Sequence, residues 1–354
     1  MKKTLVAMAV MAVAGAASAQ VTLYGTVDAG LAYEDVGGVT KTKMNSGVMN
    51  GSRWGVRGTE DLGGGLTARF QLENGFGIDN GAGGQGLATP TVGGGVVVGD
   101  TSVARMFGRQ ALVGVSGSFG SVTVGRQYTP GDIALGIDAA GAQGVGGGGA
   151  MYTVFTSNFN NVDGFGAARA DNSINYSLPA GIGGISGNLM VGLDESDVAG
   201  AKTNFVGNKF MGLNVGYAAG KVAANVAWET QTKTNASKSD TGWVAGLSYD
   251  LGVAKVGIMF AGGTNTADTT DNGWSLGVGA PMGAVRVQAS YARETSKASG
   301  ATAEAVTTGW GGNVWYDLSK RSSVYVGYLN KEDQTAAGVS TKQTHLASGL
   351  RHTF

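Results

Sequence analysis

The run Val285-Arg286-Val287-Gln288-Ala289-Ser290-Tyr291-Ala292 decides the fold class, because its apolar and polar side chains alternate. Successive side chains of a β-strand point to opposite faces, so this period of two predicts a strand with one apolar and one polar face. The same alternation returns in Leu23–Tyr33, Leu213–Tyr217 and Val256–Phe260. The sequence therefore predicts an all-β protein, and at this level a soluble β-sandwich fits as well as a membrane barrel.

Aromatic residues at both ends of one apolar face distinguish these two folds. Trp243 and Tyr249 bracket one predicted strand, and Trp310 and Tyr316 bracket another, in each case six residues apart. Six residues of strand span roughly 20 Å at about 3.4 Å per residue. On a tilted strand this length approaches the apolar band of about 25 Å, bounded by aromatic girdles, of an outer-membrane barrel. We therefore expect a transmembrane antiparallel β-barrel.

Short and long turns alternate along the chain. The short ones cover residues 61–65, 118–120, 179–184, 219–220, 251–253, 281–283 and 318–321. The long ones cover residues 34–48, 76–104, 128–171, 194–208, 233–240, 265–271, 295–306 and 332–340. Short periplasmic turns and longer outer loops are typical of a barrel meander, and the runs between these turns predict about sixteen strands.

The stretch Tyr128–Phe155 has neither strand alternation nor a helical period of useful length. Such a long irregular segment in a compact domain is usually functional. It carries two acids, Asp132 and Asp138, and a glycine cluster from Gly144 to Gly149. We expect this third long loop to fold into the lumen of the barrel and to set the width and charge of a water-filled passage.

The composition argues against several other functions. The 354 residues include 25 basic and 25 acidic ones, so bulk charge gives no case for nucleic-acid binding. With no cysteine and two histidines, we expect no metal site and no cofactor. Gly273–Gly277 has the spelling of a nucleophile elbow, but it lies in a predicted strand with no helix after it. We therefore expect no enzyme.

The first residues have the pattern of an export signal. Lys2 and Lys3 precede an apolar run, Leu5–Ala14, and Ala17-Ser18-Ala19 fits a small-residue cleavage site. The alternative, a membrane anchor, is disfavoured because the apolar run is short for a span of about 20 residues. We expect residues 1–19 to be a cleaved signal peptide and residues 20–354 to form one barrel domain.

Several linked motifs resemble the Gram-negative general porins of β-proteobacterial type. They are Ser52-Arg53-Trp54-Gly55-Val56-Arg57-Gly58-Thr59-Glu60-Asp61-Leu62-Gly63, Phe107–Gln110, Val124–Pro130, Arg169 with Asp171–Tyr176, and the ending Gly349–Phe354. The resemblance covers the whole mature chain. It implies a sixteen-stranded trimer in the outer membrane, among lipid and lipopolysaccharide, through which small ions and hydrophilic solutes diffuse passively. It also implies that the barrel assembly machinery recognises Phe354.

The resemblance further implies a constriction in which wall arginines face acids of the inward loop. Carried onto this sequence, the arginines are Arg53, Arg109 and Arg169, and the acids are Asp132 and Asp138. Strand parity adds two more lumen residues. Arg57 shares a face with Arg53, opposite Trp54 and Val56, and Glu73 shares a face with Gln71, opposite Phe70 and Leu72. Strand parity does not decide whether Arg109 faces the lumen, and it makes Arg126 a weaker candidate for the constriction, because each of these arginines shares its strand face with valines.

Three functions remain open from the sequence. The first is a general diffusion porin with mildly anionic selectivity, and the second is an outer-membrane channel selective for one class of solute. A selective channel often lines its path with aromatic residues, of which the predicted inward loop offers few. The third is an outer-membrane enzyme or adhesion barrel, for which the sequence shows no extra folded domain.

Overall fold

The computed structural model describes residues 20–83, 105–140, 169–193, 209–232 and 237–354. Its strands are β1 (Gln20–Val36), β2 (Val39–Ser46), β3 (Arg53–Gly63), β4 (Leu66–Gly75), β5 (Gln110–Gly117), β6 (Gly120–Tyr128), β7 (Arg169–Ser177), β8 (Ile185–Gly192), β9 (Lys209–Ala219), β10 (Val222–Thr232), β11 (Asp240–Asp250), β12 (Lys255–Thr264), β13 (Thr270–Met282), β14 (Val285–Lys297), β15 (Ala305–Asp317), β16 (Ser322–Gln334) and β17 (Ser340–Thr353). A short helix, α2 (Pro130–Leu135), follows β6. Within the described ranges, no helix has the length and apolar character needed to cross a membrane.

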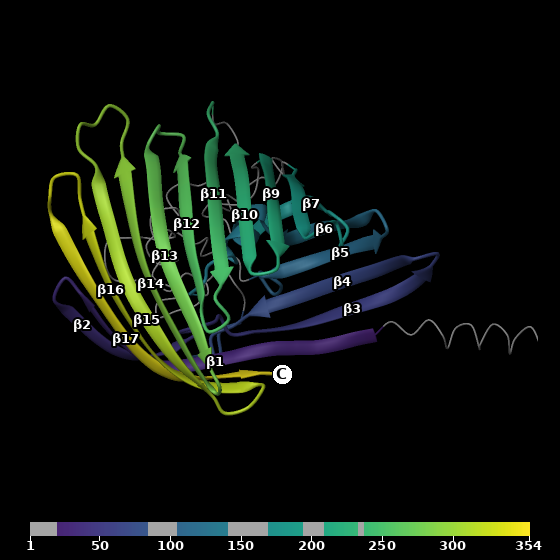
Figure 1. Ribbon diagram of the computed structural model, residues 1–354, viewed down its shortest axis with the longest axis horizontal. Helices are drawn as coiled ribbons and strands as arrows, with labels where there is room; N and C mark the ends of the chain where they lie inside the picture. Colours follow the sequence, from purple (N-terminus) through teal and green to yellow (C-terminus); the bar gives the residue numbers. More distant parts are fainter. Residues whose placement is uncertain (1–19, 84–104, 141–168, 194–208, 233–236) are drawn as a thin grey trace, which may run out of the picture.

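The strands form one closed antiparallel sheet (Figure 1). The first strand closes it, because Thr26–Val36 of β1 pairs with Gln343–Thr353 of β17. On its other edge β1 pairs with β2 through Ala29–Val36 and with β3 through Gln20–Thr26. The two strands β2 and β3 therefore share one position, and the seventeen strands of the sheet fill sixteen positions around the barrel. This confirms the predicted antiparallel barrel of about sixteen strands.

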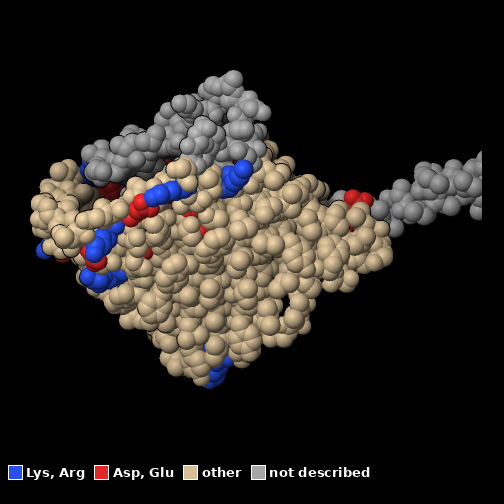
Figure 2. All heavy atoms as spheres, turned by 90° about the horizontal axis from the view of Figure 1, so that it is seen from above, with Lys and Arg blue, Asp and Glu red and all other residues tan. Residues whose placement is uncertain are grey.

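The outward face of the sheet is apolar. Leu23 on β1 is 61% exposed, Leu247 on β11 is 48% exposed and Leu350 on β17 is 51% exposed. A broad area of the molecule carries no charged residue, and the visible charges lie toward its margins (Figure 2). The aromatic residues that bracket two predicted strands are exposed on this same face: Trp243, Tyr249, Trp310 and Tyr316. So much exposed apolar surface in a closed sheet fits a hydrocarbon surrounding.

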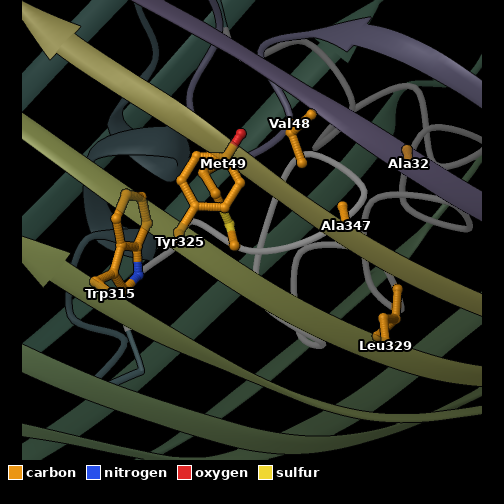
Figure 3. Close-up of a cluster of buried hydrophobic side chains, with 7 residues drawn as sticks. All are labelled: Ala32, Val48, Met49, Trp315, Tyr325, Leu329 and Ala347. Carbon is orange, nitrogen blue, oxygen red and sulfur yellow. The ribbon is translucent and has the colours of Figure 1, made fainter.

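The connection between β2 and β3 packs against the opposite, inward face. Met49 is 1% exposed and lies in a cluster with Trp315 and Tyr325 (Figure 3). The carboxylate of Asp28 accepts hydrogen bonds from Met49 N at 3.3 Å, Asn50 N at 3.0 Å and the Tyr325 hydroxyl at 2.6 Å. These bonds fix the irregular segment to β1 and β16.

The predicted long turn at residues 34–48 is wrong, because most of it is strand. The chain turns at Gly37 and Gly38, whose φ angles are +59° and +87°, and returns as β2. Two residues with positive φ are the requirement of a tight hairpin turn, which glycine meets without strain. The mainly polar, exposed residues of β2 give no apolar face that the sequence could reveal.

Phe354 completes the seam by packing on a glycine. Its backbone exchanges two hydrogen bonds of 3.1 Å with Gly25. A Cβ atom at Gly25 would lie 2.4 Å from the Phe354 ring, so only glycine leaves room for the ring there. The terminal aromatic side chain is thus held at the position where the last strand meets the first.

We predict that Gly25→Leu displaces the Phe354 ring and lowers the free energy of unfolding by about 1–3 kcal/mol, the usual cost of overpacking. Urea titration of the refolded barrel in lipid vesicles measures this. Val27→Leu, on the same strand, is the control and should change stability little. Equal stability of the two variants would contradict a packing role for Gly25.

Candidate functional site

Adjacent strands β3 and β4 bring three of the predicted residues to one face. In their register Gly55 is opposite Glu73 and Arg57 is opposite Gln71, so Arg53 and Arg57 share a face with Glu73. Glu73 is 4% exposed. Its carboxylate lies 3.9 Å from the Nε atom of Arg53, and a buried acid beside an arginine stabilises the positive charge.

Arg109 joins the same carboxylate from the chain just before β5. Its Nε donates to Glu73 Oε1 at 2.7 Å, and its backbone N donates to Glu73 O at 3.2 Å. The strand alternation begins only at Gln110, so the outward direction of Val113 and Val115 does not extend to Arg109. For this reason strand parity alone could not decide whether the Arg109 side chain faces the lumen.

Two tyrosines also belong to this group of side chains, one as a hydrogen-bond donor and the other as an acceptor. The Tyr24 hydroxyl donates to Glu73 Oε2 at 2.9 Å, and the Arg57 guanidinium carbon lies 5.0 Å from the centre of its ring. The Tyr128 hydroxyl instead accepts from Nη2 of Arg109 at 2.8 Å and from Nη2 of Arg169 at 2.7 Å. We call Arg53, Arg57, Arg109, Arg169, Glu73, Tyr24 and Tyr128 the arginine cluster.

A second acid, Asp171, pairs with two further arginines. Arg105 Nη1 lies 2.7 Å from its Oδ2 atom, and Arg126 Nη1 lies 2.6 Å from its Oδ1 atom. The pairing of β6 with β7 shifts register between Gly125 and Gln127, so parity counted from the valines of β6 does not extend to Arg126. Neither Arg105 nor the pairing of Asp171 with arginines was predicted from the sequence, although Asp171 lies in one of the motifs that resemble the porins.

The described start of the long loop is a short helix rather than irregular chain. The Thr129 side chain caps α2 by accepting from Asp132 N at 3.3 Å, and Pro130 occupies the first turn. Six residues are too few to give a helical period in the sequence. Gly131 N donates to the carboxylate of Glu229 on β10, which is 1% exposed. No pattern in the sequence indicated this contact.

Glycines on β11, β12 and β13 receive the residues that follow α2. A Cβ atom at Gly246 would lie 2.2 Å from Ile137 Cγ2, and one at Gly279 would lie 2.5 Å from Ala139 O. The face involved is opposite to that of the exposed Trp243 and Leu247. Residues 141–168 lie outside the described residues, so the folding of the whole third loop into the lumen stays a prediction.

The two loop acids occupy different places. Asp132 is half-buried, and burial raises its pKa to about 6, while the charges of Arg169 and Arg109 act to lower it. Asp138 is buried, its Oδ1 accepts from Ala140 N at 3.0 Å, and burial raises its pKa against the charge of Lys255. The charges of Arg169 and Arg109 thus act on Asp132, whereas Asp138 accepts a hydrogen bond within its own loop and the charge of Lys255 on β12 acts on it. Among the described residues, no group of His, Cys, Asp and Glu is placed to hold a metal ion.

A closed antiparallel barrel with an apolar exterior, polar groups inside and a charged cluster on its inner wall defines the class of β-barrel membrane channels. A family model described as Gram-negative porin matches residues 4–336. The chain belongs to the Gram-negative porin family, whose known members reside in the outer membrane.

Known porins are similar to this chain over all or nearly all of its length. Outer membrane porin protein 32 of Delftia acidovorans is 33% identical over 386 aligned positions, which cover 100% of both chains. The structure of an anion-selective porin from Comamonas acidovorans matches with a TM-score of 0.73 and 27% identity, covering 95% of this chain and 100% of that one. OmpF of Salmonella typhi, at 15% identity and a TM-score of 0.62, shares the fold; it covers 94% of this chain and 97% of its own. The relatives from Delftia and Comamonas are porins, which are channels rather than enzymes.

We predict that Glu73→Gln lowers the free energy of unfolding by about 3 kcal/mol, because it leaves Arg53 and Arg109 without their buried acid. Urea titration in lipid vesicles checks this value. Glu60→Gln is the matched control, since Glu60 is exposed and its side chain forms no ion pair with a described residue. A change at Glu73 no larger than the change at Glu60 would show that the carboxylate does not hold the cluster.

Proposed function

We propose that this chain forms a water-filled outer-membrane channel for passive diffusion of small hydrophilic solutes and ions, and that it favours anions. The observation that carries the proposal is the excess of positive charge at the site. Six arginines lie in or beside the cluster. Glu73 and Asp171 each pair with two of them, and the charges of Arg109 and Arg169 act on a third carboxylate, that of Asp132. Charged side chains around a narrow aqueous path bias which ions enter it.

The proposed constriction has an arginine wall and an acidic loop. Arg53, Arg57, Arg109 and Arg169 supply the wall with Glu73, and Asp132 supplies the facing charge. Asp138 belongs to this proposal as the second acid of the inward loop at the constriction. Arginine stays protonated at any working pH, so the field across the passage changes only as the acids titrate.

The family supports three further proposals. We propose that residues 1–19 are a cleaved signal peptide and that the mature chain assembles as a homotrimer among outer-membrane lipid and lipopolysaccharide. We also propose that the barrel assembly machinery recognises Phe354. One neighbour at 16% identity, OmpT of Vibrio cholerae, is described in a trimer form.

A channel selective for one class of solute is the alternative. Conductance in planar bilayers separates the two functions, because an open diffusion pore conducts roughly in proportion to salt concentration. A channel with a specific solute site saturates when that solute is present at low concentration. We expect proportional conductance in potassium chloride.

We predict that neutralising Arg53, Arg109 and Arg169 together, each by substitution with glutamine, shifts selectivity toward cations. The variant removes three positive charges and leaves the facing acids in place. The reversal potential under a potassium chloride gradient measures the shift. Arg321→Gln, in a short turn outside the cluster, should leave it unchanged. An unaltered reversal potential in the triple variant would remove these arginines from the constriction.

We predict that anion selectivity rises as the pH falls through about 6, the pKa to which burial raises Asp132. Above that value Asp132 is charged and offsets the arginines, whereas below it the carboxyl is neutral and the net positive charge increases. Reversal potentials between about pH 7.5 and about pH 5 record the change. Asp132→Asn should be nearly flat in this window, and a variant that still follows the wild-type curve would assign the titration to another group.

A further inference from the structure

The connection from β2 to β3 contains more residues than the sheet can hold at that position. Ser46 pairs with Ala29 of β1, and Arg53 pairs with Thr26. The six residues 47–52 therefore stand opposite only two residues of β1, and four of them are in excess. Because an even number is in excess, the strands on both sides of the connection keep the same alternation of inward and outward side chains. We call residues 47–52 the inward ledge.

Hydrogen bonds to Asp28 hold both ends of the inward ledge against β1. The backbone oxygen of Asp28 accepts from Gly47 N at 2.7 Å and from the Ser52 hydroxyl at 3.1 Å. Its carboxylate accepts from two backbone N–H groups in the middle of the ledge. Gly47 has a φ angle of +67°, and a Cβ atom there would lie 2.9 Å from the Cα atom of Gly51, so the chain turns back tightly where glycine fits without strain. The ledge is thus a fixed part of the wall.

The first half of the ledge lies over the inner side of the barrel. Val48 and Met49 are buried in a cluster with side chains of β1, β15, β16 and β17 (Figure 3). Trp315 in this cluster is buried, whereas its neighbours Val314 and Tyr316 are exposed on the outward face. The cluster therefore belongs to the inward face, and the excess residues occupy space inside the barrel.

The second half of the ledge reaches the arginine cluster. Arg53 Nη1 donates to Gly51 O at 3.0 Å and to Oδ1 of Asn50. Gly51 is exposed, and a Cβ atom there would lie 3.3 Å from Nη1 of Arg109. The ledge therefore stands beside two arginines of the cluster, and Gly51 forms its exposed edge.

We infer that the inward ledge is a second element that narrows the passage at the arginine cluster, and that Gly51 determines how much room remains there. The ledge belongs to the wall and is separate from the long loop after β6. Gly51 does not have a positive φ angle, so its backbone does not require glycine, and a side chain at this position would project beside Arg109. This inference rests on the proposed water-filled channel and names a residue that sets its width.

Thiol labelling in planar bilayers tests the inference with the full mature chain, which has no cysteine of its own. N-ethylmaleimide is small and uncharged, so its effect on the current reports occupied space rather than added charge. In Gly51→Cys it should react and cause a stepwise loss of single-channel conductance. Ala337→Cys, in the exposed turn between β16 and β17, is the matched control and should react without any loss.

Two results at residue 51 would overturn the inference. One is complete labelling, measured by mass, with unchanged conductance, because the added group would then lie outside the narrow part of the passage. The other is the absence of reaction in Gly51→Cys while Ala337→Cys is labelled, because residue 51 would then not face the water of the passage.

A second variant keeps the test decisive if Gly51→Cys does not fold. Deletion of residues 48–51 removes the four in excess and leaves Gly47 and Ser52 opposite Val27 and Asp28, so that β2 continues into β3. Its conductance should rise, and the polyethylene glycols that it excludes should shift to larger polymers. Conductance and exclusion equal to those of the wild type would overturn the inference. If the wild-type chain conducts no ions, the proposed function fails; if it conducts and both variants behave like the wild type, only the role of the ledge fails.

Discussion

Every backbone N–H and C=O that enters hydrocarbon must be paired within the protein, and this constraint governs the whole molecule. A sheet meets it only by closing on itself, because an open edge would leave a row of unpaired groups. Here the closure is the pairing of β1 with β17, extended by the hydrogen bonds between Gly25 and Phe354. The alternation of apolar and polar residues follows, since one face of the closed sheet meets lipid and the other does not.

Closure also creates an interior whose wall is shaped by small residues and charges. Glycines of β11 to β13 leave room for the chain after α2, and Glu229 receives the backbone of Gly131. Along another part of the wall the arginine cluster gathers around Glu73. Because arginine cannot lose its proton, these charges need either facing acids or neutral acceptors, and the structure provides both in Glu73 and Tyr128.

The fold could be predicted from the sequence because alternation is a local property of each strand. The aromatic pairs such as Trp243 and Tyr249 indicated the outward face, and strand parity assigned Arg53 and Glu73 to the inward face. The register of β3 with β4 in the structure then brings these two residues together. Local irregularities limited the rest. The hairpin between β1 and β2, which turns at two glycines with positive φ angles, was not predicted. A register shift between β6 and β7 made strand parity uninformative for Arg126.

Contacts between distant parts of the chain could not be predicted in this way. Nothing local tells which strands the segment after Tyr128 touches, so the role of Glu229 and the separate positions of Asp132 and Asp138 needed the three-dimensional structure. For Arg109, strand parity could not decide which way the side chain points, and the resemblance to the porin family indicated that it points inward.

Labelling of single cysteines along β14 tests the division between lipid and water most directly, because the chain has no cysteine of its own. The barrel would be placed in lipid vesicles and exposed to a small water-soluble thiol reagent. The account predicts that cysteines at Gln288 and Ser290 react, whereas those at Ala289 and Tyr291 do not. Equal reactivity at all four positions would contradict a sheet with hydrocarbon on one face and water on the other.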